Sequence, residues 1–170
     1  MSKKPTYEEL EQRNKELEKE AYKRRQAEEA FQQRTHDLGE RVKELNCLYG
    51  LTEIIERPNV SLKDIYQGTV DIIPASWQYP EITCARIVIN GKEYTNKNFK
   101  ETKWKQSCDI NIGGKKVGIL DVFYLKEMSI ITDEGPFLEE ERKLINALAE
   151  GLGKVTDHIQ ADEELSLIHI

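Results

Sequence analysis

The stretch "KKVGILDVFYL" at residues 115–125 decides the fold, because it is apolar on both faces except at Asp121. A strand with this pattern lies in the middle of a sheet and is covered on both sides. Gly113-Gly114 precedes it and is typical of a tight hairpin turn. The sequence therefore predicts a central strand over residues 115–125, paired antiparallel with the segment before the turn.

Three more strands are predicted upstream of this one. The segment "KWKQSCDINI" at 103–112 alternates, with Cys108, Ile110 and Ile112 inward, and "TCARIVI" at 83–89 is rich in β-branched residues. The turn signal Asn90-Gly91 then leads into "EYT" at 93–95. Antiparallel hairpins are the simplest connections between strands this close in sequence.

Helices are predicted on both sides of the strands. A helical pattern runs from residue 6 to about residue 56 and stops before Pro58, and Ser61 can cap a second helix that ends at Pro74. A long last helix begins near Pro136, with acidic residues in its first turn. The fold class is therefore α+β: a central antiparallel sheet flanked by helices, with a long helix at each end.

The first long helix carries a seven-residue repeat. Leu10, Leu17, Phe31, Leu38 and Leu45 occupy one position of the repeat, which Arg24 interrupts. The second position of the seam holds Asn14, Ala21, Glu28, Thr35, Val42 and Tyr49. The first position is mostly apolar and the second is mostly polar or small, which predicts a weak parallel coiled coil. The alternative is a seam that is marginally stable only by accident.

The predicted homodimer interface combines this seam with the apolar stripe of the last helix: Leu10, Leu17, Phe31, Leu38, Val42, Leu45, Leu148 and Leu152. We expect three segments, namely a charged coiled-coil helix over 1–44, a folded domain over 45–160, and a linker or truncated tail over 161–170. The last five residues, "SLIHI", are largely apolar and suggest a truncated or non-native end.

Charge and composition exclude several classes of function. The chain has a net charge of −6, and residues 133–170 hold 10 acidic residues against 3 basic ones, so a nucleic-acid partner is not expected. There is no apolar run long enough for membrane insertion and no secretion signal, which predicts a cytoplasmic protein. The three cysteines form no metal-binding spacing, and we expect reduced, buried thiols and no metal site.

No catalytic signature stands in the sequence, so we expect a protein that is not an enzyme. Gly113-Gly114 is followed by a strand rather than by the Lys-Ser/Thr and helix of a phosphate-binding loop. The acids at 139–141 are consecutive on a helix and splay about 100° apart, so they cannot converge on one ion.

A candidate ligand pocket is suggested by rings and charges near the strands: Trp77, Tyr79, Arg86, Phe99, Trp104 and Asp121. Arg86 is able to hold a small anionic ligand bidentately while the rings form an apolar wall, which also suits an aromatic ligand. The alternative is structural: Arg86 pairs with Asp121, Asp109 or Glu93 across the sheet, and the rings cap the edge of the core.

This order of elements, with "VGILDVFYL" followed by "DEGPFLEEERKLINALAEGLGKV", resembles the GAF-type sensory domains found upstream of PAS modules and histidine-kinase cores. The resemblance extends from about Leu45 to Ala161, and the charged leader is similar to the helical connectors that join such modules. It implies a small-ligand pocket on the sheet face opposite the helices, dimerisation through the terminal helices, and a downstream PAS or histidine-kinase module.

The family's known ligand signatures do not fit this sequence, so no cofactor is identified. Asn96-Lys97 and Phe99 match part of the cyclic-nucleotide signature, but Thr102-Lys103 replaces its acidic pair. No cysteine has the neighbouring histidine that bilin attachment needs. The expected function is a dimeric sensor and signal relay in a histidine-kinase-type system; the alternatives are a degenerate domain that acts as a dimerising spacer and, more remotely, a redox enzyme using Cys84 or Cys108.

Overall fold

The computed structural model describes residues 4–168, with side chains described up to residue 165. The chain is α+β, with a long N-terminal helix, a four-stranded antiparallel sheet and a long C-terminal helix. It divides into two compact units, Met1–Arg41 and Val42–Ile170. The first unit is helical throughout its described part apart from residues 4–6, and the second contains the sheet.

Helix α1 spans Tyr7–Ile55 and confirms the helix expected from the sequence. Its start is a capping box, in which the Glu9 amide donates to the Thr6 hydroxyl at 3.2 Å and the Thr6 amide donates to the Glu9 carboxylate at 3.2 Å. Pro58 follows its last turn, where a proline cannot continue the helix.

The four strands are β1 (Thr83–Ile89), β2 (Lys92–Thr95), β3 (Lys105–Ile112) and β4 (Lys115–Tyr124), in the order β2-β1-β4-β3. β4 pairs with both β1 and β3, so it is a central strand, as its apolar pattern predicted. The hairpin turns fall where glycine signals them: Gly91, Gly113 and Gly114 all have positive φ, which costs glycine little.

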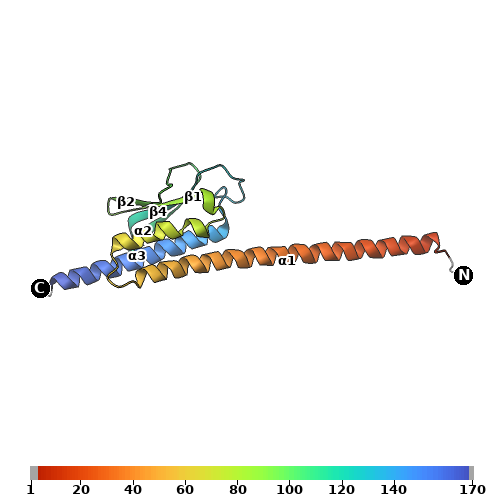
Figure 1. Cartoon of the computed structure of the whole chain (residues 1–170), viewed down its shortest axis with the longest axis horizontal. Coiled ribbons are helices and arrows are strands. Elements are labelled where there is room, and N and C mark those ends of the chain that lie inside the picture. The colour runs from red at the N-terminus through yellow and green to blue at the C-terminus, as the bar shows by residue number, and fades with distance from the viewer. Residues whose placement is uncertain (1–3, 169–170) are drawn as a thin grey trace. The chain divides into compact units, whose positions relative to one another are not determined.

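One face of the sheet is covered by helices α2 (Leu62–Ile72) and α3 (Glu139–Ile168), which lie together below the strands in Figure 1. Ser61 caps α2, as the sequence suggested, and the cap is a capping box with Asp64. The end of α1 joins this layer, because Leu51 and Ile54 are buried in the same core. Gly68 allows α2 to come close, since a Cβ there would lie 2.9 Å from the Ile54 side chain.

Two short 3-10 helices, Pro74–Ser76 and Pro80–Ile82, lead the chain from α2 into β1. Glu141 of α3 fixes this connection, because its carboxylate accepts hydrogen bonds from the Gln78 amide at 2.7 Å and from the Leu138 amide at 2.8 Å. The Tyr124 hydroxyl donates to the same carboxylate at 3.2 Å. The aromatic stretch before β1 is thus held as a helix-to-strand entry.

One expectation about the dimer interface needs correction. Leu148 and Leu152 are completely buried in the core of a single chain, so neither side chain is available to a partner. Their apolar stripe covers the sheet rather than a second copy. Residues 161–168, expected as part of a linker or truncated tail, continue helix α3, and that expectation stays open; the side chains of "SLIHI" and residues 169–170 lie outside the described part.

Candidate functional site

Strand register gathers a row of polar residues on the sheet face opposite the helices. Arg86 of β1 lies directly across from Asp121 of β4, which lies directly across from Ser107 of β3. Residues directly opposite in antiparallel strands point to the same face. Ala85, Ile87, Leu120 and Val122, which alternate with this row, are in the core on the helix side.

An ion pair forms the centre of this row. The Arg86 Nη2 atom lies 2.9 Å from Asp121 Oδ2 and its Nε atom lies 3.3 Å from the same oxygen. The Ser107 hydroxyl donates to the other Asp121 oxygen, Oδ1. Asp121 is 1% exposed and Arg86 17% exposed, so the carboxylate has almost no access to water and depends on these two partners.

Two further carboxylates surround the guanidinium. Arg86 Nη1 lies 3.6 Å from Glu101 and 3.9 Å from Glu93. Burial alone would lower the pKa of Arg86, but Asp121, Glu101 and Glu93 together raise it above its usual value, so the side chain stays charged. One positive charge among three negative ones leaves the cluster net negative.

Two phenylalanines enclose the ion pair. The Arg86 guanidinium lies 5.5 Å from the centre of the Phe99 ring and 5.2 Å from that of Phe123, within the range of cation–π contacts. The two rings meet edge to face at 5.5 Å. Phe99 thereby ties the segment between β2 and β3 to this outer face, and the Cys84 thiol approaches the Lys100 carbonyl of the same segment at 3.7 Å.

The six predicted pocket residues therefore separate into two groups. Arg86, Phe99 and Asp121 come together on the outer face. Trp77 is completely buried in the helix-side core, where its indole N–H donates to Gln106 at 3.2 Å, and Tyr79 and Trp104 pack against the same core. Trp77 therefore does not line a pocket, so the predicted aromatic wall is wrong for this ring, while Tyr79 and Trp104 support the core from its edge.

Phe123 was missed from the sequence, although a signal for it exists. It stands two residues after Asp121 on one strand, and side chains of a strand alternate, so the two share a face. Of the pairing partners proposed for Arg86, Asp121 and Glu93 are near it, whereas Asp109 pairs with Lys116 at 3.2 Å.

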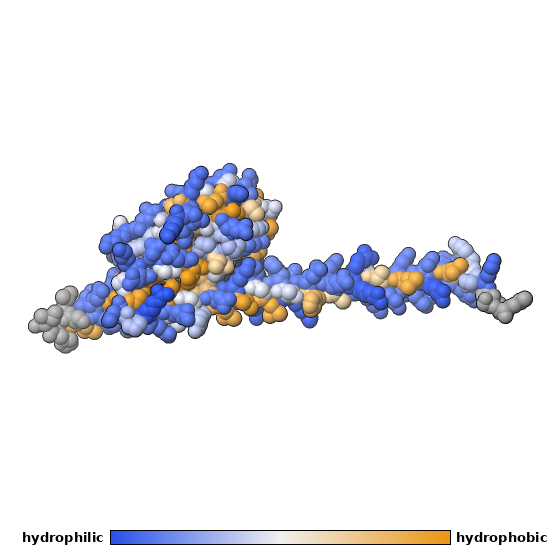
Figure 2. Space-filling view, viewed as in Figure 1, coloured by the Kyte–Doolittle hydropathy of each residue, from blue (hydrophilic) through white to orange (hydrophobic). Residues whose placement is uncertain are grey.

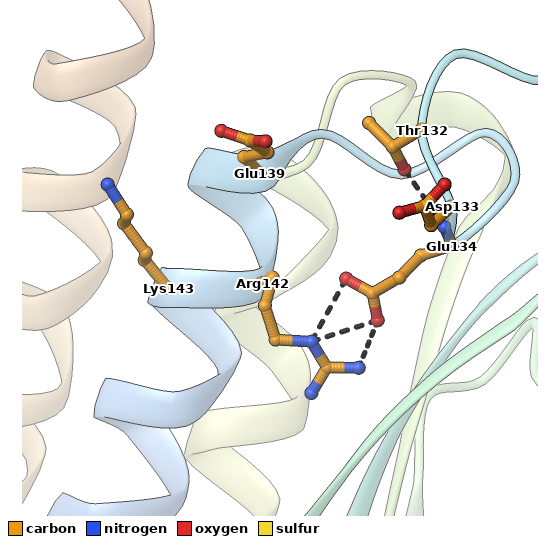
Figure 3. A pocket seen from close by; sticks show the side chains of 6 residues that line it. All are labelled: Thr132, Asp133, Glu134, Glu139, Arg142 and Lys143. Atoms are coloured by element: carbon orange, nitrogen blue, oxygen red, sulfur yellow. Dashed lines mark hydrogen bonds and ion pairs between the residues drawn. The ribbon is translucent and has the colours of Figure 1, made fainter.

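A second candidate site is an open cleft of about 340 Å³ at the start of α3. Figure 3 shows Glu134 of the preceding loop reaching Arg142 of α3, with an Arg142 Nε to Glu134 Oε1 distance of 2.9 Å. Arg142 also donates to the Ser107 carbonyl at 2.8 Å. Hydrogen bonding to Arg142 is the main cause that lowers the pKa of Glu134. Glu134 and Arg142 of this cleft fasten the loop to α3 and β3.

The cysteines do not form a redox pair. Cys84 and Phe123 share the outer face, while Cys108 and Leu120 share the helix-side face, so the sheet separates the two thiols. Burial is the main cause that raises the pKa of Cys47, Cys84 and Cys108. A raised pKa lowers the thiolate fraction and with it the nucleophilicity that a thiol enzyme needs.

Among residues 4–168, there is no group of three or more His, Cys, Asp or Glu side chains placed to hold a metal ion. The helices in that same range include none that is long and apolar enough to cross a bilayer. Comparison of the sequence with protein-family models and curated proteins, and of the structure with solved structures, found no match.

Proposed function

We propose that this chain is a homodimeric signal-relay module, in which two copies associate along α1 and the α+β unit is a GAF-like domain. The resemblance in sequence suggests a PAS or histidine-kinase module as its output partner. In this proposal helix α1 transmits the signal, because it carries the seam along most of its length and core residues such as Leu51 and Ile54 near its end.

One observation carries the proposal: apolar side chains are exposed on α1 at a regular spacing. Phe31 is 72% exposed and Leu17 56% exposed, although both are large and apolar. With the exception of Tyr22, the exposed large apolar residues of α1 all occupy the two seam positions: Tyr7, Leu10, Leu17, Phe31, Leu38, Val42, Leu45 and Tyr49. Figure 2 shows apolar side chains interspersed along this otherwise hydrophilic helix.

A second helix on this seam would gain free energy by covering it. Burial of one leucine or phenylalanine contributes roughly 1.5–3 kcal/mol. A charged helix that packs on nothing has no physical reason to keep a seven-residue repeat, whereas a two-stranded coiled coil requires one. The seam therefore fits a partner helix with the same repeat.

The outer face of the sheet supports a relay or spacer better than a sensor for anions. An anionic ligand at Arg86 would have to displace Asp121, which is 1% exposed, and would meet Glu93 and Glu101 near the same guanidinium. Leaving Asp121 buried without its partner costs several kcal/mol. We therefore assign no ligand to Arg86, and the Arg86–Asp121 pair acts as a structural link between β1 and β4.

The test is sedimentation velocity of the full chain over a concentration series, comparing the native protein with Leu17→Glu/Leu38→Glu. We expect a native dimer and a variant whose dissociation constant is raised at least 100-fold, because two buried carboxylates per chain would face the seam. Gln12→Glu/Gln26→Glu is the matched control, since it adds the same charges on the opposite side of the helix.

The control should stay dimeric, and the tryptophan fluorescence of all three proteins should match because both tryptophans lie in the second unit. A native chain that stays monomeric at tens of micromolar would contradict the proposal. Retention of the dimer by the seam variant would contradict it equally, since association would then use another surface.

A further inference from the structure

The polar residues that interrupt the seam of α1 show which helix fits it. With Tyr7 and its seven-residue successors at position a and Leu10 and its successors at position d, Asn14 and Glu28 occupy a, and Arg24 occupies d. All three are exposed, and among the side chains described for residues 4–165 neither Arg24 nor Glu28 has an ion-pair or hydrogen-bond partner. This inference rests on the dimer proposed above.

A parallel, in-register pairing of two such helices matches these charges. In a parallel coiled coil each side chain at d enters a hole of four partner residues, and one of these is the next a residue of the partner. Arg24 therefore lies against the partner's Glu28, and symmetry repeats the contact. Arg24 and Glu28, the two charged residues in the seam, therefore neutralise each other's charge across the dimer interface.

The residues flanking the seam have matching charges in the same arrangement. A residue at g approaches the partner's residue five positions later, at e. Arg13 then faces the partner's Glu18, and Glu20 faces the partner's Arg25. The other g–e pairs from Thr6 to Asn46 include no pair of like charges. Charge complementarity therefore extends along both edges of the seam.

Asn14 distinguishes a parallel from an antiparallel pairing. In the parallel dimer it faces the partner's Asn14, and an asparagine pair at position a is known to fix register and the two-stranded state. An antiparallel pairing that also brought Arg24 to the partner's Glu28 would place Asn14 against the partner's Leu38. That arrangement leaves an amide in an apolar layer without a partner.

We propose that the partner of α1 is a second copy of this chain, bound parallel and in register, with Arg24 of each chain paired to the partner's Glu28. This polar layer lowers the affinity of the dimer compared with an all-leucine seam and fixes its register. The layer thus favours pairing between copies of this chain, and the subunits exchange readily because the dimer is weak. Raised salt concentration weakens the association further.

Charge reversal tests the pairing in the full chain. Arg24→Glu and Glu28→Arg, made separately, should each raise the dissociation constant at least tenfold, because each places four like charges in one layer. The double variant Arg24→Glu/Glu28→Arg should return to within about threefold of the native value. An equimolar mixture of the two single variants should form heterodimers, seen by native mass spectrometry, because each supplies the charge that the other needs.

A double variant as weak as the single variants, or a mixture that stays monomeric, would overturn the pairing. These outcomes differ from failure of the dimer itself, in which the native chain is already monomeric. If the native chain is dimeric and charge reversal has no effect, the dimer stands and only the Arg24–Glu28 layer is wrong.

Orientation is tested by Asn14→Cys under mild oxidation. In the parallel dimer the two introduced thiols are adjacent and should form a disulfide-linked dimer in high yield. In the antiparallel alternative they lie near Leu38 of the opposite chain, about 36 Å apart along the axis, and cannot cross-link. Gln12→Cys on the outer side of the helix and the oxidised native chain are the controls, and cross-linking equal to theirs would overturn the parallel arrangement.

Discussion

The two units of this chain treat their apolar residues in opposite ways. In Val42–Ile170 most apolar side chains of the sheet and of α3 lie in one core, and the buried Asp121 and Glu141 have hydrogen-bond partners. In Met1–Arg41 large apolar residues such as Phe31 are exposed at a regular spacing. The sheet and the helices packed on it bury their core within one chain, whereas α1 presents a seam, continued by Val42, Leu45 and Tyr49, that a partner can cover. We therefore place association on α1 and stability in the α+β unit.

The largest expected change in stability comes from a comparison of two leucines, one in each unit. Leu148→Ala removes a completely buried side chain and should lower the free energy of unfolding by about 2–5 kcal/mol. Leu17→Ala should leave it unchanged at concentrations low enough for the chain to be monomeric, because Leu17 is 56% exposed in one chain and packs on no core. Urea unfolding followed by the fluorescence of Trp77 and Trp104 reports on the second unit alone, and equal losses for the two variants would break the comparison.

The next effect concerns the ion pair on the outer face. Arg86→Ala should lower the free energy of unfolding by about 3 kcal/mol, because it leaves the buried Asp121 carboxylate with Ser107 as its remaining partner. The double variant Arg86→Met/Asp121→Leu should recover most of that loss, since Phe99 and Phe123 provide an apolar surrounding. Chemical denaturation of the single and double variants measures both.

An outcome in which Arg86→Ala leaves stability unchanged would contradict the structural role given to Arg86. It would reopen the interpretation of this residue as a ligand-binding group. Arg86→Lys is a useful third variant, because it keeps the charge but cannot place two fixed donors on Asp121 Oδ2. We expect it to fall between the native chain and Arg86→Ala.

Local features of the fold could be predicted from the sequence, because their signals are local. The turn glycines, the alternation of 103–112 and the β-branched content of 83–89 predicted β3 and β1, and Ser61 marked the start of α2. These patterns act over a few residues, so tertiary packing had little opportunity to override them.

The candidate site was harder to predict from the sequence, because it depends on strand register and on which surface covers each apolar stripe. The apolar stripe containing Leu148 does not say whether a sheet or a second chain covers it, and the sheet does. Trp77 looked like a pocket residue beside the strands, but the turn before β1 directs its ring into the core. The pairing of Arg86 with Asp121 was one of several alternatives until strand register placed them opposite each other.

The smallest expected effect concerns the Glu134–Arg142 pair that fastens the loop to α3. Both side chains are about one-third exposed, so Glu134→Gln should cost only about 0.5–1 kcal/mol at pH 7. Arg142 lowers the folded-state pKa of Glu134, so this contribution is complete above the unfolded-state pKa and is lost as pH falls through the lower folded value. The difference in stability between the native chain and Glu134→Gln should therefore be constant near neutral pH and shrink below about pH 4. Urea titrations of both proteins at several pH values measure it, and a difference that persists undiminished into strong acid would mean that the loop is held by its other contacts, such as the Thr132 hydroxyl that donates to the Phe137 carbonyl.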